Sequence, residues 1–171
     1  MSTNDQIEAV HANFSRIYLG GIPGILNDEG AFLSFICGLT ATEALGGFLE
    51  PQSGNGDRFR RFVARYFPEP LRSRADDLWK LRNAAVHGFS PGPFILTHHN
   101  GHLHLRQHEG RLILNAEDFF ALLVLATQKY FEDVRRDDEL QRAFVKRVSD
   151  PDTGVMVVGP IEVSLENRTT T

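Results

Sequence analysis

Apolar residues in the first ninety positions recur at the three- and four-residue spacing of amphipathic helices. Ile7, Val10, Phe14 and Ile17 form the first set, and Gly20-Gly21 ends it. Later sets are bounded by capping residues and by prolines; Asn27 or Asp28 can cap the second helix and Asp57 the third. The pattern predicts four helices, at about residues 7–17, 29–46, 57–66 and 71–88.

Beyond Pro93 the helical spacing gives way to alternation of apolar and polar residues. Asn100-Gly101 and Glu109-Gly110 have the composition of two-residue hairpin turns, so residues 94–114 are expected to form a three-stranded antiparallel meander. Asn115 would cap a last long helix that reaches about Val148. A turn and a short strand, residues 155–158, are expected in the tail.

The predicted elements fit one mostly helical domain at residues 1–150, a bundle of about five helices with the 94–114 insertion, followed by a tail at 151–171. The only cysteine, Cys37, allows neither a disulfide framework nor a cysteine-based zinc site within one chain, which favours a reducing, cytoplasmic location. The N-terminus does not have the pattern of a signal peptide, and no stretch approaches the roughly 20 apolar residues of a membrane span. We therefore expect no membrane association.

The fourth helix carries an arginine in the middle of its apolar face. At 100° per residue, Arg82 falls within the arc formed by Leu71, Ala75, Leu78, Leu81 and Ala85. A buried guanidinium needs a carboxylate, a ligand phosphate or an interface that leaves it partly hydrated, because burying it unpaired is very costly. Glu43 interrupts the apolar stripe of the second helix in the same way, so we expect Glu43 and Arg82 to lie close together.

The same helix ends with a second polar group, His87, followed by Gly88. Asn83 lies four residues before His87, so its amide can orient the imidazole. A fixed cation that stabilises phosphate charge and an imidazole that moves protons suit metal-free cleavage of RNA through its 2′-hydroxyl. The alternative is structural, with Arg82 in a core ion pair and His87 capping the helix. Because Arg82 and His87 are about 140° apart around one helix, they would not easily converge on one phosphate within a single chain, and a symmetric dimer that faces its two motifs together would solve this.

The segment Leu81-Arg-Asn-Ala-Ala-Val-His-Gly88 resembles the signature of the HEPN superfamily, an arginine and a polar residue followed by a histidine near a helix end. The resemblance covers about two thirds of the chain, with the 94–114 sheet as an insertion. It implies a helical bundle, a homodimer formed through the motif face and, in many members, a metal-independent endoribonuclease with Arg82, Asn83 and His87 as catalytic residues. Other members bind a nucleotide or a protein partner without catalysis, which is the alternative function.

Two further groups of residues are candidates for binding. The net charge of −4 argues against bulk electrostatic binding of nucleic acid, but arginines concentrate between positions 58 and 74 and can follow an RNA backbone. The predicted RNA-binding residues are Arg58, Arg61, Arg65, Arg72 and Arg74. His99, His102 and His104 should share one strand face and are weak metal candidates, because no carboxylate or cysteine completes a site. We expect no metal and no other cofactor for the RNA chemistry.

Overall fold

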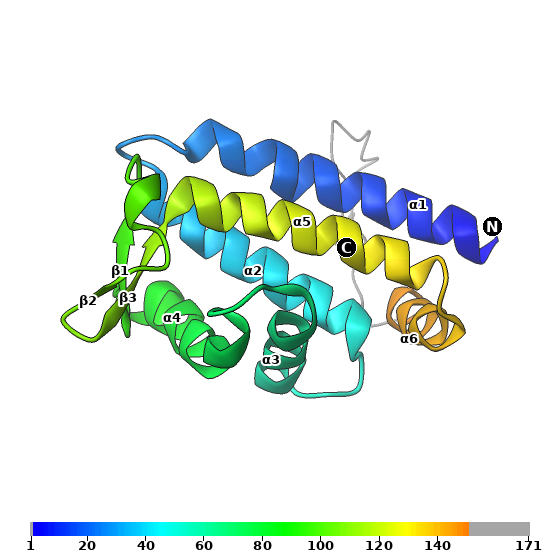
Figure 1. The fold of residues 1–171 in the computed structure, drawn as a ribbon. Coiled ribbons are helices and arrows are strands. Elements are labelled where there is room, and N and C mark those ends of the chain that lie inside the picture. The colour runs from blue at the N-terminus through cyan, green and yellow to red at the C-terminus, as the bar shows by residue number, and fades with distance from the viewer. Residues whose placement is uncertain (1, 151–171) are drawn as a thin grey trace, which may run out of the picture.

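A computed structural model describes residues 2–150 of the chain. The described part is mostly helical, as expected, and carries a small three-stranded sheet (Figure 1). The α-helices are α1 (Thr3–Phe14), α2 (Ala31–Leu49), α3 (Asn55–Tyr66), α4 (Ala75–Gly88), α5 (Ala116–Val134) and α6 (Asp138–Val148). The strands are β1 (Phe94–Thr97), β2 (Gln107–His108) and β3 (Arg111–Asn115). The strand expected at residues 155–158 lies outside the described residues.

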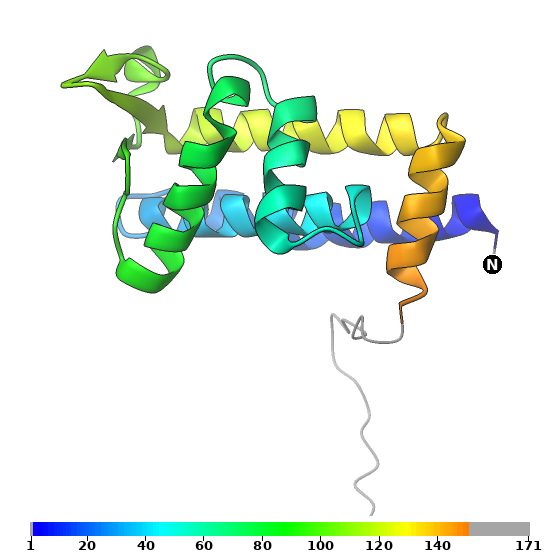
Figure 2. The same cartoon turned by 90° about the horizontal axis from the view of Figure 1, so that it is seen from below.

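The helices form two layers with α2 at the centre. The long helices α1, α2 and α5 run side by side, and the shorter helices α3, α4 and α6 lie across them on one side (Figure 2). Because α2 packs against neighbours in both layers, its apolar residues occur all round the helix. At Gly46 the packing is so close that a Cβ would lie 2.6 Å from the backbone oxygen of Arg58 in α3.

The sequence led us to expect no stretch as long and apolar as a membrane span, and helix α2 corrects this expectation. Over its 19 residues the helix is long and apolar enough, by those criteria alone, to cross a membrane. In the structure 61% of the apolar window is buried inside the protein, as in the core helix of a globular domain. Its buried hydroxyls are satisfied within the helix, because Thr42 donates to the carbonyl of Gly38 at 2.8 Å.

Several helix boundaries differ from the expected ones. Helix α2 has Gly30 as its N-cap in place of Asn27 or Asp28. Helix α3 begins at Asn55, so Asp57 lies in its first turn and does not cap it. Leu71 begins a 3-10 turn, Arg72–Arg74, and α4 starts only at Ala75. The predicted last helix is broken into α5 and α6, because the Asp137 carboxylate accepts hydrogen bonds from the N–H groups of Glu139 and Leu140 and starts a new helix.

The sheet is not the expected antiparallel meander. Its order is β1-β3-β2, with β1 parallel to β3 and only β2 antiparallel to β3. The Glu109-Gly110 turn is present, with both residues at positive φ as a two-residue hairpin requires. The predicted turn at Asn100-Gly101 is wrong, because Gly101–Leu103 form a 3-10 turn. This turn lies in the connection from β1 to β3, and β3 runs parallel to β1. The sheet lies at one end of the bundle (Figure 1).

Candidate functional site

Arg82 and Glu43 are in contact, as their positions on two apolar helix faces led us to expect. Arg82 Nε lies 2.7 Å from Glu43 Oε2, and the two side chains are 19% and 10% exposed. The N–H does not point along the direction of a hydrogen bond, so the contact is an ion pair. The carboxylate therefore compensates a charge that the surrounding core could not accept unpaired.

Two further contacts fix the Arg82 guanidinium. Its carbon lies 5.5 Å from the centre of the Trp79 ring, within the range of a cation–π interaction. Its Nη1 donates to Asn83 Oδ1 at 3.2 Å. Among the described residues no acceptor is placed for Nη2, so one edge of this partly exposed cation is available to a ligand.

His87 occupies the last turn of α4 and is exposed. The expected contact between Asn83 and His87 is not present within the described part of the chain, because the Asn83 amide oxygen accepts from Arg82 instead. The amide thus positions the arginine and not the imidazole. Within one chain Arg82 is held by several contacts, whereas His87 is exposed.

Exposed apolar side chains surround the end of α4. Val86 is 42% exposed and Phe89, the residue after the helix, is 83% exposed. The Phe89 ring packs edge-on against Phe32 of α2, with 4.9 Å between centroids, and the next residue of α2, Leu33, is 51% exposed. Polar His87 is therefore flanked by apolar surface, a combination more typical of a contact surface than of a solvated helix end.

The predicted RNA-binding arginines are divided among several interactions. Arg61 pairs with Glu50 at 2.9 Å and Arg74 with Asp77 at 3.6 Å, which removes part of the expected positive charge. Arg72 Nε donates to the carbonyl of Phe67, and Arg58 Nε is buried without a hydrogen-bond partner in the described residues. Arg65 lines a surface hollow of about 340 Å³ between α6 and the end of α2.

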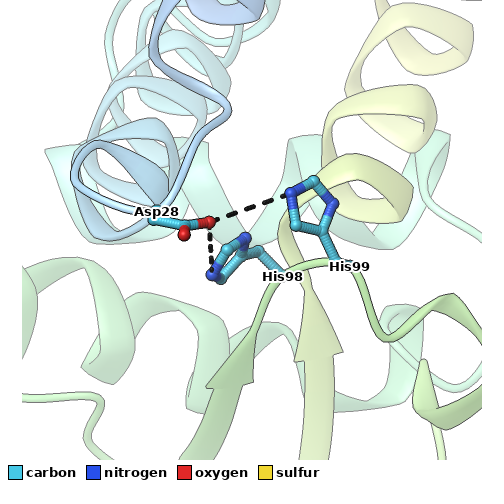
Figure 3. Close-up of side chains that lie close together, drawn as sticks. All are labelled: Asp28, His98 and His99. Carbon is cyan, nitrogen blue, oxygen red and sulfur yellow. Dashed lines mark ion pairs between the residues drawn. The ribbon is translucent and has the colours of Figure 1, made fainter.

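The three histidines that we considered as metal ligands do not converge. His102 is exposed, whereas His104 is half-buried and its Nδ1 accepts a hydrogen bond from the N–H of Asn115 at 3.0 Å. Burial lowers the pKa of His104, against a smaller opposing effect of the Asp118 charge. His99 instead lies beside His98 and Asp28 (Figure 3).

The residues of this second cluster come from distant parts of the chain. Asp28 lies in the connection before α2, and His98 and His99 follow β1. The sequence did not point to this cluster, because His98 was not among the histidines expected on the polar strand face and Asp28 was assigned only a capping role. No short-range spacing links the three residues, so only the tertiary fold could identify them.

Comparison of the chain with models of protein families, with curated proteins and with solved structures found no match.

Proposed function

We propose that this chain is a cytoplasmic HEPN-like domain that acts as a homodimer and cleaves RNA without a metal ion. Arg82 would stabilise the phosphate, His87 would act as general acid or base, and Asn83 would position Arg82. The observation that carries the proposal is that α4 holds a fixed, partly exposed guanidinium and, within the next turns, an exposed imidazole. Neither member of the motif is sealed in the core.

The chemistry needs only these groups. As the 2′-oxygen of the RNA attacks the adjacent phosphorus, its proton passes to a base, the bond from phosphorus to the 5′-oxygen breaks, and that oxygen receives a proton. The products are a 2′,3′-cyclic phosphate and a 5′-hydroxyl. Nη2 of Arg82, which has no partner among residues 2–150, would stabilise the negative charge that develops on the phosphate oxygens.

The proposed dimer would supply what one chain lacks. Arg82 and His87 diverge by about 140° around α4, and a two-fold axis beside the helix would set the arginine of one protomer near the histidine of the other. The apolar surface at Val86, Phe89 and Leu33 would be covered in that dimer.

Sedimentation analysis tests the dimer directly. We expect Phe89→Ser to shift the chain to monomer, and the matched variant Leu125→Ser, which removes another exposed apolar side chain from α5, to leave the dimer intact. Equal behaviour of the two variants would contradict an interface at the end of α4.

The nuclease test uses labelled single-stranded RNA in excess EDTA. We expect cleavage by the wild type, loss of at least about a hundredfold in rate in His87→Ala, and no effect of His108→Ala, which removes another exposed histidine. A DNA strand of the same sequence should remain intact, because it has no 2′-hydroxyl. Failure of the wild type to cleave, or equal rates in the two variants, would refute the catalytic role of His87.

A non-catalytic module that binds a nucleotide or a protein partner is the second candidate. The close Glu43 carboxylate favours a non-catalytic role, because this carboxylate offsets the positive charge that Arg82 could offer to a phosphate. This candidate expects no cleavage in the experiment above. It also expects retention of RNA or nucleotide binding in His87→Ala, measured by fluorescence anisotropy.

A further inference from the structure

Three metal-binding side chains converge beside the sheet, at a place unrelated to the Arg82 motif. The Asp28 Oδ1 atom lies 3.7 Å from His98 Nε2 and 4.0 Å from His99 Nε2, and the three donor atoms lie within 4.8 Å of one another. Figure 3 shows both rings turned toward the carboxylate. These separations are too long for hydrogen bonds.

The separations are close to those of ligands around a single ion. Donor atoms that each lie about 2.0–2.1 Å from a tetrahedral zinc ion are roughly 3.3–3.4 Å apart. To reach that geometry the Asp28–His98 separation would shorten by about 0.3–0.4 Å, the Asp28–His99 separation by about 0.6–0.7 Å and the separation between the two imidazole donors by at most about 1.5 Å. Asp28 and His99 are 81% and 65% exposed, so both can make this adjustment without disturbing the core.

Glu117 prepares His99 to act as a ligand. His99 Nδ1 lies 2.9 Å from Glu117 Oε1, and the backbone N–H of His99 donates to the same carboxylate. A proton held on Nδ1 by this contact leaves the lone pair on Nε2, which faces Asp28. Metal-binding histidines commonly donate their second N–H to a carboxylate in this way, which fixes the ring and raises its basicity.

A further contact holds Glu117 in this position. The amide of Asn115 donates to Glu117 Oε2 at 2.9 Å, so the carboxylate stays turned toward His99. The lone pair of His99 and the carboxylate of Asp28 therefore face each other with a second carboxylate behind them. A divalent cation between His99 and Asp28 would be attracted by the negative charge of the carboxylates and by the imidazole lone pair.

We propose that Asp28, His98 and His99 bind one Zn²⁺ ion, with Glu117 as a positioning residue and solvent in the remaining coordination position. Two imidazoles and one carboxylate form a ligand set typical of zinc. His98 contributes the weaker bond, because its Nδ1 is buried without a partner among residues 2–150. The ion would tie the connection before α2 to the segment after β1. The RNA chemistry proposed above does not involve it.

Zn²⁺ titration of the full chain by calorimetry tests the site. We expect one ion per chain in the wild type and loss of this binding in Asp28→Ala and in His99→Ala. The double variant His102→Ala/His108→Ala, which removes two exposed histidines from the same insertion, should bind as the wild type does. Glu117→Gln should weaken binding by about 10- to 100-fold.

Two controls keep the test decisive. Circular dichroism should show that Asp28→Ala is folded, since Asp28 lies outside the helices and strands and is largely exposed. Zn²⁺ should raise the melting temperature of the wild type and not that of Asp28→Ala, because a ligand that binds only the folded state stabilises it. Equal affinity in the wild type and Asp28→Ala, or absence of binding in the wild type, would overturn the proposal. The three side chains would then be a polar surface cluster that binds no metal.

Discussion

The Arg82–Glu43 ion pair allows a quantitative test of how burial changes the contribution of an ion pair to the free energy of unfolding. Replacing Glu43 by glutamine leaves the Arg82 cation facing a neutral amide in a largely dry environment. Removing one partner of a fully buried pair costs about 3–5 kcal/mol. Because Arg82 remains 19% exposed and keeps its contact with Trp79, we expect Glu43→Gln to lower the free energy of unfolding by about 2–3 kcal/mol.

The measurement is a double-mutant cycle by urea denaturation, with Glu43→Gln, Arg82→Met and the combined variant. We expect a coupling energy of about 2 kcal/mol, because the second substitution removes the charge that the first leaves unpaired. The control is a cycle on Arg61 and Glu50, whose contact has nearly the same length, 2.9 Å, but whose side chains are 60% and 35% exposed. Its coupling should be below about 1 kcal/mol. Equal coupling in the two cycles would refute the assignment of the difference to burial.

Two further predictions concern pH and packing. Burial lowers the pKa of His104 from 6.5, so as the pH falls below 6.5 the unfolded chain binds a proton that the folded chain does not, and stability decreases. His104→Asn should reduce this decrease relative to His102→Asn in urea titrations at pH 5 to 7, and parallel pH profiles would contradict it. Gly46→Ala should destabilise by about 1–3 kcal/mol in thermal unfolding, because its Cβ would meet the backbone oxygen of Arg58. Gly21→Ala, where a Cβ meets no atom within 4 Å, should be close to neutral, and an equal loss in both variants would rule out this steric explanation.

Much of the helical architecture could be predicted from the sequence, because helix spacing and capping are local properties. The contact between Glu43 and Arg82 could also be predicted, from an energetic requirement in addition to the local spacing. Each charge interrupts an apolar stripe, and two opposite charges in one small core are expected to pair because an unpaired buried charge is very costly. The angular spacing of 100° per residue predicted the helix face on which each residue lies. The packing of α4 against α2 brings those two faces together.

The errors share one physical cause, which is that local patterns do not specify partners. Alternation predicted strands within residues 94–114 but could not distinguish a parallel from an antiparallel neighbour for β1. The Asn100 backbone N–H donates to the side chain of Asn115 at 2.9 Å, a contact between the interior of the insertion and the residue that follows it. The meeting of Asp28 with His98 and His99 depends on the same long-range arrangement.

Phe89 has a consequence for protein engineering. It adopts φ 47° and ψ 47°, a conformation in which a side chain costs about 1–2 kcal/mol and glycine costs little. Its edge contact with Phe32 recovers only part of that cost, because the ring is 83% exposed. A selection for heat tolerance alone would favour glycine at this position and would remove the most exposed aromatic ring at the end of α4. Thermostabilised versions intended for functional work should therefore retain phenylalanine here and gain their stability at other positions.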